Sequence, residues 1–191
     1  MEKKQVIYIF RHGQTTFNRD GKFTGFIDAK LTKKGIVQAK KIANILKNKK
    51  FQVAFYTRLS RSKDTLKYVL KEHPECKKLI KDDRMIERNY GVLNGKTHNE
   101  FIKKFGKKEY DLIHRAYNHP PKKGESFKMV EKRVANFIKF LIPFMKKNKV
   151  SVAISGHGNS IRLFRKIMEK TSTEKMIKWE IPYDKVFTYK V

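Results

Sequence analysis

The sequence predicts an α/β protein, a three-layer α/β/α sandwich around a mostly parallel sheet with a small cap inserted over the carboxyl ends of the strands. Short apolar runs, typical of buried strands, alternate with longer segments whose apolar residues recur at helical spacing. At 39% hydrophobic and 12% aromatic, the 191 residues can bury a core despite a formal charge of +28. We expect one domain over residues 1–191, with the cap at about 88–124.

Strands and helices are expected to alternate through the first half of the chain. Residues 6–10 have the sequence VIYIF, a continuous apolar run that indicates a parallel strand buried on both faces. A helix should follow at 32–46, where apolar residues recur every three or four positions. A short strand at 53–56, a helix at about 59–70 and an extended piece that ends at 85–86 complete this half.

The second half begins with the expected cap. Thr97 and Glu100 have capping-box spacing, which predicts a helix that runs to about residue 105. The segment 106–124 is the least regular and contains a short candidate helix at 109–117. The remaining elements are expected to be a long helix from 127 to about 143, a core strand at 150–155, a helix at 160–169 and a last strand at 186–191 suited to a sheet edge.

The positive charge is distributed along the whole chain. The sequence has 46 Lys and Arg against 18 Asp and Glu, with lysine pairs from Lys33-Lys34 to Lys146-Lys147. A domain that binds nucleic acid specifically usually gathers its cations on one stripe. We therefore predict a solvated basic surface whose field attracts anionic partners, with no specific nucleic acid.

Other classes of protein are disfavoured by the pattern. No apolar run approaches the ~18 residues of a membrane span, and the N-terminal segment lacks the features of a signal peptide. The single cysteine, Cys76, can form no internal disulfide, and no Cys or His pair has zinc-site spacing. We expect a cytoplasmic, metal-independent protein without a membrane partner, and the sequence is compatible with a homodimer.

Two predicted strands end in His-Gly. His12-Gly13 follows the first strand, and His157-Gly158 follows the strand at 150–155 and opens a helix. Ligands in such sheets bind beyond the carboxyl ends of the strands, and a helix N-terminus favours anions. One such histidine alone is more often structural. Two of them, with Arg11 beside the first, indicate a site.

Arginines and one acid complete a candidate phosphoryl site. Arg58 and Arg61 share a helix face after the strand at 53–56, and spacing leaves open which of them joins Arg11. Glu87 is the candidate acid, and its alternative is a surface ion pair with Arg88. A neutral imidazole nucleophile with a nearby carboxylic acid indicates phosphoryl transfer through a phosphohistidine, for which no metal is required.

Six motifs in one order carry a resemblance to a known family. The chain resembles the phosphoglycerate-mutase-like branch of the histidine phosphatase superfamily over essentially its whole length. The motifs are RHGQTTFN at 11–18, FTGFIDAKLTKKG at 23–35, TRLSRSKDT at 57–65, ERNYGVLNGKT at 87–97, PPKKGES at 120–126 and SGHGNSIR at 155–162.

The resemblance implies a role for each matching residue. His12 would be the phosphorylated nucleophile and Glu87 the proton donor. Arg11, Arg61 (rather than Arg58) and His157 would form the phosphate pocket. We expect nine further residues, which match the family's motifs or lie beside the matching positions, to contact the substrate. They are Asn18, Gly25, Arg88, Tyr90, Lys96, His114, Arg115, Gly158 and Asn159.

Two enzyme classes remain open within this family. Where mutases of the family place a lysine after the ERxYG segment, this chain has His98, with Lys96 nearby. At the paired arginines of those mutases stand His114 and Arg115. These departures and a short cap favour a phosphomonoesterase that passes the phosphoryl group to water.

The alternative is a 2,3-bisphosphoglycerate-dependent phosphoglycerate mutase, which interconverts 2- and 3-phosphoglycerate in glycolysis. In that case 2,3-bisphosphoglycerate would be the phosphoryl primer; otherwise no cofactor is expected. A non-catalytic module that binds polyanions is a minor alternative, suggested by the charge of +28 alone.

Overall fold

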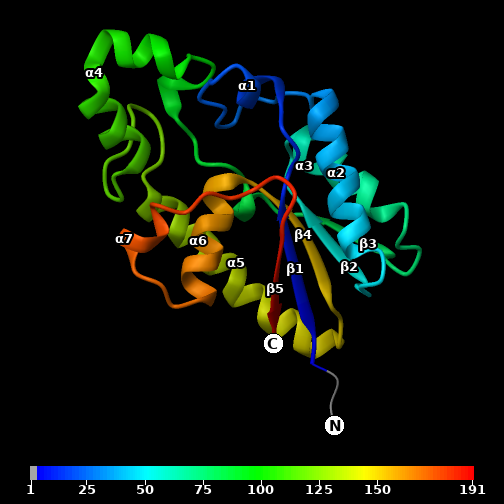
Figure 1. Cartoon of the computed structure of the whole chain (residues 1–191). Helices are drawn as coiled ribbons and strands as arrows, with labels where there is room; N and C mark the ends of the chain where they lie inside the picture. The colour runs from blue at the N-terminus through cyan, green and yellow to red at the C-terminus, as the bar shows by residue number, and fades with distance from the viewer. Residues whose placement is uncertain (1–3) are drawn as a thin grey trace.

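A five-stranded sheet forms the centre of the molecule, whose computed structural model describes residues 4–191 (Figure 1). The strand order is β3-β2-β4-β1-β5. The first four strands in this order are parallel, and β5 pairs antiparallel with β1 at the edge. The strands are β1 (Val6–Arg11), β2 (Val53–Tyr56), β3 (Lys78–Lys81), β4 (Val152–Gly156) and β5 (Val186–Lys190). The mostly parallel sheet and the edge position of the last strand are thus confirmed.

Helices cover both faces of this sheet. In β1, Ile7 and Ile9 belong to one buried cluster, whereas Tyr8 and Phe10 belong to the other, because successive side chains point to opposite faces. The helices are α2 (Lys33–Leu46) and α3 (Ser60–Leu70) on the face of Tyr8, and α5 (Phe127–Asn148) and α6 (Gly158–Met168) on the other. This arrangement is the three-layer sandwich that the alternating pattern predicts.

The helix α4 (His98–Arg115) belongs to the cap, begins at an N-terminal capping box and is interrupted by a glycine. Thr97 and Glu100 form the expected capping box, and Gly106 interrupts the helix with φ 84° and ψ 161°. Glycine adopts this conformation without the steric cost that a Cβ would bring. The interruption explains why the sequence predicts two short helices here, one on either side of Gly106.

Several boundaries differ from the sequence prediction. The strand β3 was not expected, because a lysine stands at each end of this edge strand and Leu79 is exposed. The 3₁₀ turn Asp83–Met85 occupies the predicted extended piece. The helix α5 continues through Pro143 to Asn148, and α6 begins two residues early. Three short elements were also not predicted: α1 (Thr16–Arg19), the 3₁₀ turn Gly91–Leu93 and α7 (Thr173–Met176).

The cap has a small core of its own. Figure 1 shows α4 standing away from the sheet, on the side where the parallel strands end. Arg88 fastens the cap, since its guanidinium donates from Nε to the Glu125 carbonyl at 2.6 Å and from Nη2 to the Ile113 carbonyl at 2.9 Å. The buried residues of the cap core are Phe23, Tyr90, Leu93, Phe101 and Ile113.

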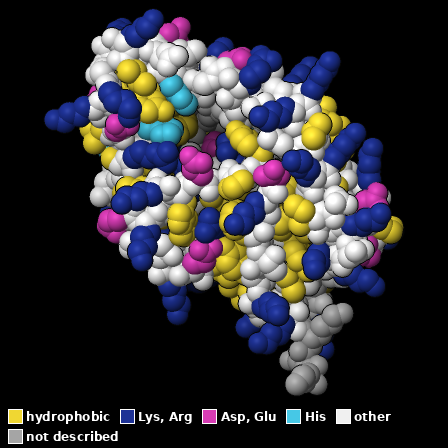
Figure 2. Space-filling model, viewed as in Figure 1, with side chains coloured by type: hydrophobic (Ala, Val, Ile, Leu, Met, Phe, Trp, Pro, Cys, Tyr) yellow, Lys and Arg dark blue, Asp and Glu magenta, His cyan; other side chains and the backbone are white. Residues whose placement is uncertain are grey.

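The face of the molecule seen in Figure 2 agrees with the scattered charge. Figure 2 shows Lys and Arg side chains spread over the visible face rather than gathered in one stripe. Among residues 4–191, no helix is both long and apolar enough to cross a membrane.

Candidate active site

The two predicted histidines meet at the carboxyl ends of neighbouring strands. Because Arg11 pairs with Gly156 in the parallel ladder, His12 and His157 leave the sheet side by side. Their ring centroids are 5.0 Å apart, and their side chains are only 1% and 0% exposed. The sequence prediction that the two His-Gly pairs share one edge is thus confirmed.

A hydrogen bond defines the tautomer of His12. Its Nδ1 lies 2.7 Å from the Gly13 carbonyl oxygen. A carbonyl only accepts, so Nδ1 carries the proton and Nε2 keeps a free lone pair. Burial lowers the pKa of His12 well below 6.5, and the charges of Arg61 and Arg11 lower it further. The ring is therefore neutral, and nucleophilic at Nε2, at neutral pH.

Close backbone packing holds this loop in place. A Cβ on Gly13 would lie 2.2 Å from the carbonyl oxygen of Gly35, and one on Gly35 would lie 2.1 Å from the Gln14 oxygen. Neither position has room for a larger residue. The glycine after His12 therefore lets the loop press against the start of α2.

Three buried nitrogen atoms around His12 have no hydrogen-bond partner among the described residues. They are Nε of Arg11, Nε of Arg61 and Nδ1 of His157. The Nε2 of His157 lies 2.8 Å from the Thr57 hydroxyl, so when that hydroxyl donates, Nδ1 carries an N–H. Buried donors are rarely left unpaired, because each costs about 1–3 kcal/mol. The set fits an anion with several acceptor oxygens, such as a phosphoryl group.

Neighbouring carbonyls orient the two guanidinium groups. Arg61 donates to the carbonyls of Gly25 and Ile27, each at 2.8 Å, and Arg11 donates to the Ile181 carbonyl at 3.0 Å. Burial lowers the pKa of Arg61 to about 10, so it stays charged at neutral pH. Arg58 instead pairs with Asp83 at the surface, at 2.9 Å. The choice between Arg58 and Arg61 thus falls on Arg61.

Glu87 lies at the N-terminus of α6, beside Arg11. Its Oε1 accepts from the backbone N–H of Arg88 at 2.7 Å and of Asn159 at 3.2 Å. A Cβ on Gly158 would lie 3.6 Å from Oε2 of Glu87 and 3.5 Å from Cζ of Arg11. Glu87 is 7% exposed, and the Arg88 guanidinium binds cap carbonyls instead. The alternative of a surface ion pair between the two side chains is therefore wrong.

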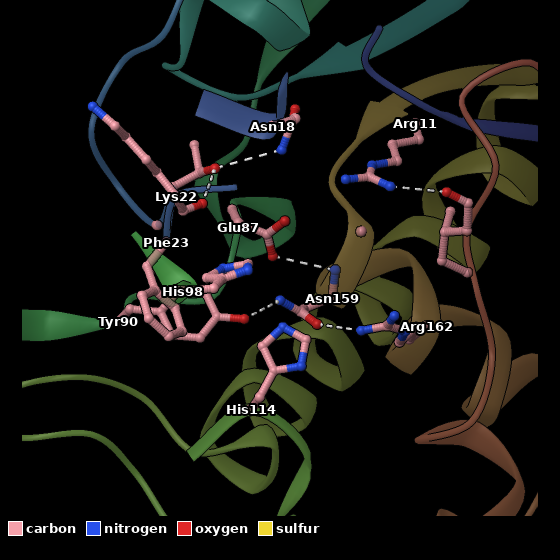
Figure 3. Close-up of a pocket in the computed structure, with 14 residues that line it drawn as sticks. Arg11, Asn18, Lys22, Phe23, Glu87, Tyr90, His98, His114, Asn159 and Arg162 are labelled. Carbon is pink, nitrogen blue, oxygen red and sulfur yellow. Dashed lines mark hydrogen bonds between the residues drawn. The ribbon is translucent and has the colours of Figure 1, made fainter. Parts of the chain in front are cut away.

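A cavity opens in front of this cluster, between the cap and the sheet. Figure 2 shows the visible face hollowed there, next to histidine side chains. Figure 3 shows Arg11 and Arg162 on one side of the cavity, aromatic rings on the other, and Glu87 and Asn159 between them. His12, Arg61 and His157 are buried and are not among the lining residues. The predicted residues that line the cavity are Arg11, Asn18, Gly25, Glu87, Tyr90, His114, Gly158 and Asn159.

Three predicted substrate contacts lie outside this lining. Arg88 is used inside the cap, as described above. Lys96 has an exposed side chain, while His98 lines the cavity in its place. Arg115 donates to the Ile177 carbonyl at 2.8 Å and so ties α4 to the end of α7. These three residues are not part of the lining, so their predicted role as substrate contacts stays a prediction.

The sequence prediction also missed part of the lining. Arg162 donates to Asn159 Oδ1 at 2.7 Å and to the Trp179 carbonyl at 2.8 Å. Its spacing of three residues after Asn159 places both on one face of α6, a signal that could have revealed it. The other residues missed are Lys22, Phe23 and Thr24, which begin or adjoin a quoted motif, and Ile181.

Fold and site together define an α/β enzyme with arginines and unpartnered nitrogens gathered at the carboxyl ends of its strands. The chain belongs to the histidine phosphatase superfamily (branch 1), whose family model matches residues 7–190. This membership favours an enzyme over the non-catalytic polyanion-binding module. Enzymes of this family generally need no metal, and within residues 4–191 no three His, Cys, Asp or Glu side chains are grouped to hold one.

Similar proteins of both activities are known. The 2,3-bisphosphoglycerate-dependent phosphoglycerate mutase of Parvibaculum lavamentivorans is 33% identical over 176 residues, which cover 90% of this chain and 83% of that protein. The alpha-ribazole phosphatase from Shigella flexneri has a similar structure, with TM-score 0.82, 21% identity and coverage of 96% and 89%. The phosphoglycerate mutase from Bacillus anthracis has TM-score 0.79, 24% identity and coverage of 98% and 88%. The structures of these two enzymes have the same fold as this chain.

We predict that stability falls in acid because buried histidines must stay neutral in the folded state. Burial, together with nearby cations such as Arg115, lowers the pKa of His114 to about 3, whereas an unfolded histidine titrates near 6.5. Below pH ~6.5 the unfolded chain binds the extra proton, so the free energy of unfolding decreases as pH falls. In His114→Gln this decrease should be smaller by about 1 kcal/mol between pH ~6.5 and ~5.5.

Denaturant unfolding at several pH values measures this effect. The control is His119→Gln, since the His119 side chain is exposed and lies outside the cavity lining. It should keep the wild-type pH profile. A His114→Gln profile parallel to that of the wild type would contradict the prediction.

Proposed function

We propose that this chain is a phosphomonoesterase that transfers a phosphoryl group from a small phosphorylated metabolite to His12, and then to water. One observation carries the proposal. The free Nε2 of a neutral His12 stands among three buried nitrogens, on Arg11, Arg61 and His157, that have no hydrogen-bond partner among residues 4–191. N–H groups at these positions would stabilise the equatorial oxygens of a phosphoryl group in the transition state of its transfer.

The first step forms a phosphohistidine. Nε2 of His12 attacks phosphorus, and the bond between phosphorus and the ester oxygen breaks. The leaving alkoxide takes a proton from Glu87, which enters this step as the carboxylic acid with the proton on Oε2, since Oε1 accepts two backbone N–H bonds. The Gly13 carbonyl keeps the Nδ1 proton in place while Nε2 becomes substituted.

The second step returns the enzyme to its starting state. The Glu87 carboxylate removes a proton from water, the water oxygen attacks phosphorus, and the bond to Nε2 breaks. Inorganic phosphate then leaves. In this proposal Asn18, Gly25 and Gly158 help to hold the phosphoryl group, and Tyr90 and Asn159 contact the remainder of the substrate.

The cap supports water as the acceptor. A mutase must retain a bisphosphorylated intermediate and so needs positive charge for its second anion. Here His98 and His114 line the cavity, and burial lowers the pKa of both, that of His114 to about 3. Neither ring is charged at neutral pH, so neither contributes to retention of a second anion. Besides Arg11, the lining then has Lys22 and Arg162 as cations for that purpose.

A second candidate is the 2,3-bisphosphoglycerate-dependent phosphoglycerate mutase. The observation in its favour is the activity of relatives such as the 33% identical mutase of Parvibaculum lavamentivorans. In such relatives 2,3-bisphosphoglycerate is the primer. The cytoplasmic location, a homodimer and the single domain with its cap at about 88–124 stay predictions under either candidate.

An assay with two readouts separates the candidates. The enzyme is given a panel of phosphomonoesters that includes 3-phosphoglycerate, with and without 2,3-bisphosphoglycerate, and both phosphate release and 2-phosphoglycerate are measured. We expect phosphate release to exceed isomerisation and to vanish in His12→Ala but not in His119→Ala. Isomerisation with little free phosphate would instead identify a mutase.

The acid role of Glu87 gives a further prediction. Glu87→Gln should reduce kcat for alkyl phosphates by about 10²–10⁴-fold, because an alkoxide needs a proton to leave. For p-nitrophenyl phosphate the loss should stay within about 10-fold, since that leaving group needs little protonation. The matched control is Asp184→Asn, a half-exposed carboxylate outside the cavity lining. Equal losses on both substrates would remove the acid role.

A further inference from the structure

The two sides of the cavity differ in chemistry. Arg11 and Arg162 lie on one side, near the phosphoryl site, and Phe23, Tyr90 and His98 gather on the other (Figure 3). A phosphomonoester bound through His12 would therefore extend its alcohol portion toward rings rather than toward arginines.

The rings of this aromatic side support one another. Phe23 lies 4.5 Å from His98 and 5.0 Å from Tyr90, between ring centroids. His114 lies nearly parallel to Tyr110, at 5.0 Å and 13°, and 5.6 Å from His98. Tyr110 also places its hydroxyl 3.3 Å from Nδ1 of His98. The rings thus form one packed wall, defined here as Phe23, Tyr90, His98 and His114, with Tyr110 behind it.

The cations near this wall are engaged by other groups, and the Arg88 guanidinium, bound to cap carbonyls, lies 5.1 Å from the centre of the Tyr90 ring. Arg115, next to His114, is turned to the Ile177 carbonyl. Lys22 lines the cavity with its ammonium 5.2 Å from the centre of the Phe17 ring. Arg162 is held by Asn159 and the Trp179 carbonyl on the opposite side. A carboxylate pressed against the wall would lose water and gain contact mainly with ring surface.

We propose that this wall selects phosphomonoesters whose alcohol portion is uncharged and carries a flat ring. The inference rests on the proposed function and names its substrate class. A flat ring can stack on the wall or meet it edge-on, and the imidazole nitrogens of His98 and His114 can still bond a neutral polar group. His98 and His114 are thus specificity-determining residues.

Binding of non-hydrolysable phosphonates tests the proposal apart from turnover. Calorimetry compares 3-phenylpropylphosphonate, butylphosphonate and 4-carboxybutylphosphonate, which share the phosphonate and differ at the far end. The wild type should bind the phenyl compound about 3- to 10-fold more tightly than the butyl compound, and the carboxylate compound most weakly. Turnover of the corresponding phosphate esters is measured in parallel.

Reintroduced charge should reverse this order. The variant with His98→Lys and His114→Arg should gain about 10-fold or more for the carboxylate compound and lose its preference for the phenyl compound. His98→Lys alone, at a partly exposed position, should move in the same direction and serves if the double variant does not fold. The control His119→Lys adds a charge at an exposed position outside the cavity lining and should leave the order unchanged.

The outcomes separate the two claims. A wild type that binds the carboxylate compound as tightly as the phenyl compound overturns the inference, as does a histidine variant that folds and keeps the wild-type order. Failure of the proposed function has a different signature, in which the phenyl preference is present but no ester releases phosphate.

Discussion

The site depends on keeping one imidazole neutral in the midst of positive charge. The hydrogen bond from Nδ1 of His12 to the Gly13 carbonyl, 2.7 Å long, leaves the lone pair on Nε2. Burial and the charges of Arg61 and Arg11 keep the proton off that atom, because they lower the pKa of His12. The same cations that suppress protonation would attract the phosphoryl group. In the proposed reaction, one arrangement would thus serve both the nucleophile, His12, and the phosphoryl group that it attacks.

The fold maintains this arrangement at a cost. The Nε–H donors of Arg11 and Arg61 and the Nδ1 atom of His157 stay unpaired in the described part of the chain, and each buried unpaired group opposes stability by about 1–3 kcal/mol. The packing of the buried strands offsets this cost. Strands β1 and β4 are neighbours in the sheet and are packed on both faces, so the strand ends that carry His12 and His157 stay close together. An anion bound among these donors would pair them. The site is therefore preorganised for its ligand rather than for the empty state.

The sequence predicted the elements whose structure is determined by a local pattern. It did not predict features of the site that depend on the direction in which a side chain points. Apolar runs revealed the strands that end at His12 and His157, and cap spacing revealed the start of α4. Edge strand β3 has too short an apolar pattern to be found. Whether Arg88 points into the cavity or into the cap depends on carbonyls of residues up to 37 positions away, which no motif encodes. Arg162 was missed although its helical spacing from Asn159 was visible.

The central claim is that Nε2 of His12 carries the phosphoryl group during turnover. The most direct test is rapid quenching in alkali during turnover of a good substrate, followed by peptide mass spectrometry and phosphorus NMR. Our account predicts an acid-labile, alkali-stable adduct on His12, bonded through Nε2 because Nδ1 is occupied by the Gly13 carbonyl. Active enzyme without such an adduct, or with the adduct on His157 instead, would contradict it.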